Sequence, residues 1–324
     1  MKPSVSYTSN PGGRNHMRTT ARATAVVAAA LAATAALTGV ASAKGGSIGG
    51  SGPQYYLNDS LSGSANRVFV YGDPADEVFF GDFDGNGTDT PMIRRAGTFY
   101  VRNSLSSGPA DAVYAYGNPG DVILTGDWDG NGTDTPAVRR GGVYYIKNST
   151  GSGPADAVIA YGDPGDQVLV GDWNADGVDT LTVRRGGVYY VKNSISGGNA
   201  DAVVAYGDPG DRVLVGDWDG NGTDTLGIRR GGTYYLRNSL SSGPAESVFG
   251  YGNPGDTVFV GDWDGNGTDT LGARRPVNPG DSKNCTDFRT QREAQAWFDY
   301  YFPYYGDVAG LDSDRDGIAC ELNP

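Results

Sequence analysis

The chain is organised around a ten-residue stretch that reads Gly126-Asp127-Trp128-Asp129-Gly130-Asn131-Gly132-Thr133-Asp134-Thr135. The pattern occurs five times, and successive copies begin 45 residues apart, at Gly81, Gly126, Gly171, Gly216 and Gly261. Oxygen-bearing side chains recur at alternate positions, and a glycine follows the third of them. Such a loop can surround a hard cation with oxygen atoms, and it can also serve simply as a tight turn.

Each 45-residue unit contains four short runs that favour β-strands, separated by clusters of Gly, Pro, Asn and Asp. Four strands of about five residues, with their turns, fill one blade of a β-propeller. Five such units between Tyr55 and Arg275 predict a mainly β fold, a five-bladed β-propeller. An open β-solenoid is the alternative, because neither end of the repeats offers an obvious spare strand to close a ring.

The third run of each unit is apolar almost throughout, as in Val168-Leu169-Val170 and Val213-Leu214-Val215. A strand without polar alternation is buried on both of its faces. We therefore expect this run to be a middle strand of its blade, covered by the neighbouring blades.

Residues 1–43 have the features of a secretory signal peptide. Basic residues precede an alanine-rich apolar run, and Ala41-Ser42-Ala43 matches a cleavage site. The run is near the lower length limit for crossing a bilayer, so an uncleaved anchor is the alternative. We expect a secreted, extracellular protein without stable membrane insertion after cleavage, either free or associated with the cell wall. Residues 44–54 are rich in Gly and Ser and predict a flexible linker.

Charge and composition exclude several classes of function. The predicted signal peptide contains four of the 25 basic residues, none of the 38 acidic residues and the only histidine, His16. The mature chain would therefore be strongly acidic, which argues against nucleic acid as a partner. Without histidine it has neither a Ser-His-Asp triad nor a Cys-His pair.

The 45-residue period ends near Arg275. Residues 276–282 contain two prolines and a glycine and predict a linker, and residues 283–324 differ in kind from the repeats. Thr290-Gln291-Arg292-Glu293 forms a capping box, which predicts a helix that ends near Tyr301, before Pro303. This small domain has too little core to be secure without a further constraint.

That constraint can come from cysteine or from metal. Cys285 and Cys320 are the two cysteines, and an even count in a secreted chain predicts a disulfide. A loop at residues 312–317 places carboxylates at its positions 1, 3 and 5 and a glycine at position 6, like the first half of a calcium loop. A solvated acidic turn is the alternative. The proposed ligands are the side chains of Asp312, Asp314 and Asp316 and the carbonyl of Ile318.

Residues 284–321 resemble the Excalibur domain, an extracellular calcium-binding module of bacteria. The resemblance rests on Asn284-Cys285 at the start and on the pattern Asp-x-Asp-x-Asp-Gly-x-x-Cys-Glu at the end. It implies Ca²⁺ at the three loop aspartates, with Glu321 as a further ligand, and a disulfide between the two cysteines.

The five repeat loops are weaker metal candidates. We count the first aspartate of each loop, such as Asp127, as position 1. The third copy has its amide at position 3 and its carboxylate at position 5, the reverse of the other copies. This exchange keeps the charge and both oxygens, as a ligand role requires. A purely structural turn is the alternative. The candidate ligands are Asp82, Asp84 and Asn86; Asp127, Asp129 and Asn131; Asp172, Asn174 and Asp176; Asp217, Asp219 and Asn221; and Asp262, Asp264 and Asn266.

These units resemble FG-GAP/VCBS propeller repeats, which carry calcium loops of the form Asp-x-Asp/Asn-x-Asp/Asn-Gly-x-x-Asp. The resemblance covers residues 55–275 in period and loop. This chain departs from the pattern at position 9, where Thr135 and its equivalents replace the aspartate, while position 8 holds an aspartate such as Asp134. Either the aspartate reaches round into the loop, or the threonine hydroxyl substitutes for it, or the site has lost calcium.

Aromatic residues and arginine pairs also recur in every unit. Position 2 of the loop is Phe83 or a tryptophan, which we expect to pack between blades, with a platform for sugar rings as the alternative. Tyrosine pairs such as Tyr144-Tyr145 are interpreted in the same way. Arginine pairs such as Arg139-Arg140 are expected to form ion pairs with nearby aspartates rather than an anion site.

The sequence favours a secreted, calcium-binding, non-enzymatic module that binds glycan or cell-wall ligands through a repeated surface. A polysaccharide hydrolase or lyase is the second hypothesis, because a pair of carboxylates suffices for glycosidase chemistry. Near-identical repeats, however, supply few of the unlike residues that an active site needs. A purely structural surface protein is the third hypothesis.

Overall fold

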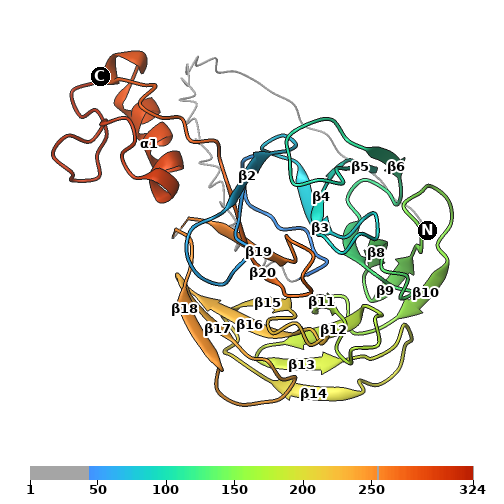
Figure 1. Ribbon diagram of the computed structural model, residues 1–324. Helices are drawn as coiled ribbons and strands as arrows, with labels where there is room; N and C mark the ends of the chain where they lie inside the picture. The colour runs from blue at the N-terminus through green and yellow to red at the C-terminus, as the bar shows by residue number, and fades with distance from the viewer. Residues whose placement is uncertain (1–43, 254, 324) are drawn as a thin grey trace, which may run out of the picture. The chain divides into compact units, whose positions relative to one another are not determined.

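The computed structural model describes residues 44–253 and 255–323, and the predicted signal peptide lies outside them. Twenty strands form five antiparallel four-stranded sheets arranged around a central axis, which confirms the five-bladed propeller (Figure 1). We number the blades by their position in the chain. Blades 1 and 2 consist of β3 (Glu77–Gly81), β4 (Thr90–Arg95), β5 (Thr98–Val101) and β6 (Ala112–Ala115), and of β7 (Val122–Gly126), β8 (Thr135–Arg140), β9 (Val143–Ile146) and β10 (Ala157–Ala160).

The other three blades follow the same plan. Blade 3 consists of β11 (Gln167–Gly171), β12 (Thr180–Arg185), β13 (Val188–Val191) and β14 (Ala202–Ala205). Blade 4 consists of β15 (Arg212–Gly216), β16 (Thr225–Arg230), β17 (Thr233–Leu236) and β18 (Ser247–Gly250). Blade 5 joins β19 (Thr257–Gly261) and β20 (Thr270–Arg275) to β1 (Gln54–Leu57) and β2 (Arg67–Val70).

Blade 5 closes the ring. Its two inner strands come from the end of the repeats and its two outer strands from their beginning, with Gln54 opposite Arg275 and Leu57 opposite Gly272 in an antiparallel register. The sequence unit and the structural blade are thus out of phase by two strands. This offset removes the need for a spare closing strand and excludes the open solenoid.

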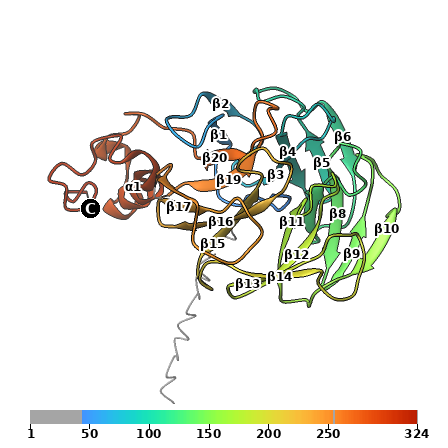
Figure 2. The ribbon, with the colours of Figure 1, turned by 60° about the horizontal axis from the view of Figure 1, so that its bottom comes forward.

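The apolar third run of each unit is the innermost strand of its blade, and not a middle strand as its composition suggested. The inner strands β3, β7, β11, β15 and β19 surround the axis, whereas β6, β10 and β14 lie at the periphery in both views (Figure 1 and Figure 2). Crowding around the axis buries both faces of each inner strand, as for Phe79 and Val170, which are fully buried.

The cores of the propeller lie between adjacent blades. Trp128 of blade 2, for example, packs in one cluster with Tyr144 of its own blade and Leu181 of blade 3. All four tryptophans and Phe83 at loop position 2 are between 1% and 5% exposed. Their predicted role in packing is therefore confirmed, and none of them forms an open platform for a sugar.

Residues 44–52 lie along the inner strands and differ from the flexible linker that their composition predicts. The N–H of Thr125 in β7 donates to the Gly45 carbonyl at 2.7 Å, and the N–H of Ile48 donates to the Val78 carbonyl of β3 at 2.8 Å. The Ile48 side chain is 2% exposed. Glycine is needed here because a Cβ on Gly45 would collide with the Thr125 carbonyl and with Val170.

The C-terminal residues form a small unit with a 3₁₀ turn at Cys285–Asp287 and helix α1 at Gln291–Tyr305. Thr290 caps the helix by accepting the N–H of Glu293, as predicted. The helix extends beyond its expected end because Pro303 occupies the last turn, where its missing N–H removes a single bond. No helix among the described residues is long and apolar enough to cross a membrane.

Candidate functional site

The C-terminal loop brings together the three aspartates that its spacing singles out. One carboxylate oxygen from each of Asp312, Asp314 and Asp316 lies within 4.8 Å of the others, and no other part of the described chain groups three acidic side chains in this way. Asp312 is 6% exposed, and its carboxylate accepts the N–H groups of Asp316 at 3.2 Å and Gly317 at 2.9 Å. These bonds fold the loop around its first ligand, and Gly317 adopts the required left-handed conformation, with φ of 92°.

Glu321 lies close enough to the three aspartates to be influenced by them. The negative charges of Asp316 and Asp314 raise the pKa of the Glu321 carboxyl above its ordinary value. A divalent cation among these oxygens would replace this repulsion with attraction, since a nearby opposite charge favours the ionised form. Ile318 follows Gly317 directly, its N–H donates to Asp316 at 2.8 Å, and its side chain is exposed.

Two residues that the sequence did not single out hold this loop in place. Gln295 of α1 donates to the Gly317 carbonyl at 3.0 Å and accepts the N–H of Ala319 at 2.8 Å. Asp307 accepts the N–H of Leu311 at 2.8 Å and that of Asp312 at 3.1 Å. Gln295 directly follows Ala294, which lies on the apolar face of the helix. This position next to the apolar face is the sequence feature that could have pointed to Gln295.

The disulfide predicted between Cys285 and Cys320 is present, with an S–S distance of 2.08 Å. Cys320 packs in a small core with Ala294 and Phe298 of α1 and with Leu311. The bridge therefore ties the end of the calcium-type loop to the start of the domain, across a separation of 35 residues.

The five repeat loops have the same internal hydrogen bonds as the C-terminal loop. In the copy at Asp127, the carboxylate accepts the N–H groups of Asn131 at 3.1 Å and Gly132 at 2.7 Å, which are loop positions 5 and 6. Asn131 in turn accepts the N–H of Thr133 at 2.8 Å, as Asp316 does from Ile318. The third copy keeps this pattern despite its exchanged residues, because Asp172 accepts the N–H of Asp176 at 3.2 Å.

Loop positions 8 and 9 face away from the oxygen cluster of their own loop. Asp134 accepts the backbone N–H of Asp82 in blade 1 at 3.0 Å, and the hydroxyl of Thr135 lies 3.5 Å from the Gly126 carbonyl at the loop base. Neither side chain replaces the missing position-9 aspartate of the FG-GAP/VCBS pattern. Each repeat loop therefore offers two carboxylates and one amide, a less charged set than the C-terminal loop.

Small pockets recur between the blades. Three equivalent ones have volumes of about 340, 410 and 260 Å³. The first is lined by the turn at Tyr116-Gly117-Asn118, by Arg140 and by Tyr145. The corresponding arginine and tyrosine line the others, namely Arg275 with Tyr56 and Arg95 with Tyr100.

Arginine and tyrosine stack in the same way in every blade. The Arg140 guanidinium lies 5.2 Å from the centre of the half-buried Tyr145 ring and forms an ion pair with Asp121 at 2.7 Å. The preceding tyrosine, Tyr144, is fully buried, so the two tyrosines of a pair face opposite sides of their strand. The predicted Arg–Asp pairing is confirmed. Equivalent stacks are Arg95 with Tyr100, Arg185 with Tyr190, Arg230 with Tyr235 and Arg275 with Tyr56.

A larger bowl of about 1210 Å³ lies where the inner strands begin. Four unlike residues at the first position of these strands line it: Glu77, Val122, Gln167 and Arg212. The acidic residues around it are held by arginines. Hydrogen bonds from Arg140 lower the pKa of Asp121, and those from Arg185 lower the pKa of Asp166, so these two carboxyls are poor proton donors at neutral pH.

Comparison with known proteins finds a domain match in the C-terminal part of the chain. No curated protein matches the sequence. Among solved structures, the crystal structure of BBS1N in complex with ARL6DN, soaked with mercury, is similar at 12% identity and a TM-score of 0.32, over 55% of this chain and 54% of that one. A similarity at this level supports no inference about this chain. Residues 282–321 match the family model of the Excalibur calcium-binding domain.

Proposed function

We propose that this protein is a secreted, calcium-binding, non-enzymatic module that binds extracellular or cell-wall glycan at the arginine–tyrosine stacks that line its inter-blade pockets. The observation that carries the proposal is the arginine–tyrosine stack that recurs in all five blades. Its calcium-binding part rests on the match of residues 282–321 to the Excalibur domain.

The chemistry of the pockets suits a sugar residue. An exposed tyrosine edge offers apolar contact to the C–H face of a sugar ring, and arginine, aspartate or asparagine groups beside it offer hydrogen bonds to hydroxyls. Volumes of 260 to 410 Å³ lie at the low end for small-ligand sites and suit one or two sugar rings. Five copies on one rigid ring would bind a repeating polymer far more tightly than one copy could.

The distribution of acidic groups favours binding over catalysis. A glycosidase needs one carboxyl that is protonated at working pH and a second that is ionised. In the bowl, the carboxyl pKa values of Asp121, Asp166 and Asp211 are all lowered by arginine hydrogen bonds. All three carboxyls therefore favour the ionised form, and none of them suits the role of the protonated acid. This supports the non-enzymatic proposal.

Calcium is proposed at six loops. The Excalibur loop supplies three carboxylates that converge on one point. The repeat loops share its hydrogen-bond pattern at positions 1, 5, 6 and 7, with Asp127, Asn131 and Gly132 in the places of Asp312, Asp316 and Gly317. Their lower charge predicts weaker binding than at the C-terminal loop.

Co-sedimentation with insoluble cell-wall polysaccharide tests the proposal. We expect the mature protein to sediment with the polymer and a variant with alanine at all five stacked tyrosines to stay in solution. The matched control replaces exposed outer-strand valines, Val113, Val158 and Val203, with threonine and should bind normally, since these side chains are 58% to 61% exposed. Equal sedimentation of the tyrosine variant would contradict the proposal, as would release of sugar from the polymer by the pure protein. The five tyrosines are Tyr56, Tyr100, Tyr145, Tyr190 and Tyr235.

A further inference from the structure

Five aspartates, one from position 8 of each repeat loop, form a ring around the central axis of the propeller. Each of them accepts the backbone N–H of the first loop aspartate in the preceding blade, at 2.8 to 3.1 Å. All five are at most 9% exposed. We call this set the aspartate ring; it consists of Asp89, Asp134, Asp179, Asp224 and Asp269.

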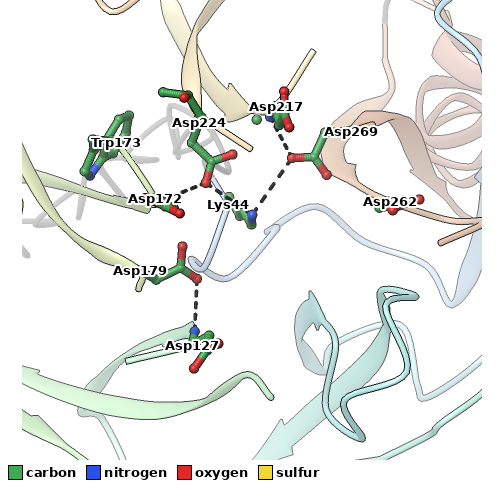
Figure 3. Close-up of polar contacts among 12 residues, drawn as sticks. Lys44, Asp127, Asp172, Trp173, Asp179, Asp217, Asp224, Asp262 and Asp269 are labelled. Carbon is green, nitrogen blue, oxygen red and sulfur yellow. Dashed lines mark hydrogen bonds and ion pairs between the residues drawn. The ribbon is translucent and has the colours of Figure 1, made fainter. Parts of the chain in front are cut away.

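Lys44 supplies positive charge to the aspartate ring. Its Nζ atom lies 3.2 Å from a carboxylate oxygen of Asp224 and 4.0 Å from one of Asp269 (Figure 3). Burial alone would lower the pKa of Lys44, but Asp224 and Asp269 raise it well above its ordinary value, so the side chain stays charged. No other lysine or arginine of the described chain forms an ion pair with the ring.

One positive charge leaves the ring under-compensated. Five buried carboxyl groups face the single ammonium of Lys44, and that ammonium lies within ion-pair distance of only two of them, Asp224 and Asp269. One oxygen of Asp224, Oδ1, is buried without a hydrogen-bond partner in the described part of the chain. Both observations indicate that the ring can accept a second cationic group.

The backbone of Lys44 enters the ring on the side where that charge is missing. The next residue, Gly45, is bonded to Thr125 of β7 and packs against Val170 of β11. Gly126, which follows Thr125, packs against Asp179. The main chain of residue 44 thus lies beside blades 2 and 3, while its side chain reaches the aspartates contributed by blades 4 and 5.

The sequence supplies a chemical source for the second charge. Lys44 directly follows Ala41-Ser42-Ala43, the predicted cleavage site. A signal peptidase would hydrolyse the Ala43–Lys44 peptide bond with one water molecule, leaving a carboxylate on Ala43 and an amino group on Lys44. An α-amino group has an ordinary pKa near 7.7 to 8.0 and is mostly an ammonium at neutral pH.

We propose that the aspartate ring is a binding site for the processed amino terminus of this chain, with the α-ammonium and the ε-ammonium of Lys44 as its two cations. The α-ammonium pairs with the ring on the side of Asp134 and Asp179, and the ε-ammonium pairs with Asp224 and Asp269. Removal of the signal peptide then adds a second positive charge to the five carboxyl groups of the ring and stabilises the closed propeller.

Amine labelling of the full mature chain, beginning at Lys44, tests the site directly. An amine-reactive reagent at neutral pH should modify the α-amino group at least about tenfold more slowly in the native than in the urea-unfolded protein, because one unit of raised pKa alone lowers the free-amine fraction tenfold. Lys283, a half-buried lysine in the C-terminal unit and outside the ring, is the internal control. Equal labelling of the α-amino group in both states would overturn the proposal.

A second measurement uses three forms of the chain. We expect the form with a free α-amino group to melt at a higher temperature than α-acetylated and Ala-extended forms. Asp134→Asn should reduce this difference, whereas Asp111→Asn, at an exposed position outside the ring, should preserve it. Identical melting temperatures for the free and acetylated forms would contradict the α-ammonium contact even if the Asp134 variant failed to fold.

Discussion

Asp134 is bonded twice to Asp82, a residue of the neighbouring blade 52 positions earlier: its carboxylate accepts the Asp82 N–H at 3.0 Å, and its own N–H donates to the Asp82 carbonyl at 2.7 Å. The same pair of bonds joins every blade to the next, including blade 5 to blade 1 through Asp262 and Asp89. Position 8 of the repeat is therefore an inter-blade clamp, which explains why it is an aspartate in all five copies.

Replacing Asp134 with alanine should destabilise the propeller. The N–H of Asp82 would remain partly buried without its acceptor, which costs about 1–3 kcal/mol. Asp134→Asn keeps a carbonyl oxygen that can accept the Asp82 N–H, so it should lose less stability than the alanine variant. Urea denaturation of both variants checks the free energy of unfolding. A larger loss for asparagine than for alanine would contradict the clamp.

The ring should make stability depend on pH between about 5 and 8. Burial raises the pKa of Asp89 to about 7 and that of Asp179 to about 6, so the folded state binds more protons than the unfolded state in this window. The free energy of unfolding should therefore fall as pH rises from 5 to 8. Melting curves across this range measure it. A flat profile for the wild type, or an equal slope in Asp89→Asn, would speak against the ring as the source.

Loss of a carboxylate from the C-terminal loop should weaken calcium binding there. Asp314 is exposed and makes its contribution through its charge and oxygen, so Asp314→Asn should raise the dissociation constant about tenfold or more without unfolding the domain. Asp281→Asn, which alters an exposed acid in the linker, is the matched control. The assay is a titration with a competing fluorescent chelator. Equal affinities for the two variants would exclude Asp314 as a ligand.

Removing the aromatic ring at loop position 2 should be among the most destabilising single changes in the propeller. Trp128 is 4% exposed, and its Nε1 donates to the Thr135 carbonyl at 2.8 Å. Trp128→Ala should cost about 3–5 kcal/mol in the free energy of unfolding. The exposed Val113 provides the comparison, since Val113→Ala should change it by less than about 0.5 kcal/mol. A small loss at Trp128 would mean that the blades do not depend on this packing.

The sequence predicts local features of this fold better than pairings between distant residues. The 45-residue period is enough to define the blade, because all turns and strand runs lie within one unit. The pairing of β1 with β20 joins the two ends of the repeats, so nothing inside a unit reveals the two-strand offset. The composition of residues 44–52 is misleading for a related reason. Gly45, Gly50 and Gly52 lie too close to Thr125, Thr257 and Arg275 for a Cβ, but the same glycine-rich composition also describes a flexible linker.

The candidate sites show the same contrast between local contacts, which the sequence predicts, and contacts between distant residues, which it does not. The C-terminal loop could be predicted residue by residue, since Asp312, Asp314 and Asp316 lie within five positions and fold against one another locally. The partner of Asp134 lies in another blade, so the sequence motif suggested a ligand for its own loop. Arg140 and Tyr145 lie on adjacent strands of one blade, so their stack is a local feature. The pocket beside them is also lined by the turn at Tyr116-Gly117-Asn118, and the repeat pattern does not show that this turn lies there.

Calorimetric titration with calcium tests the central claim most directly. The samples are the full mature chain and a variant in which Asp312, Asp314 and Asp316 are all replaced by asparagine. The account predicts several calcium ions per chain in the first sample, the tightest of them lost in the second, and weaker sites at the five repeat loops retained. Unchanged binding in the variant would contradict the C-terminal site, and a single ion in the full chain with none in the variant would show that the repeat loops act only as turns.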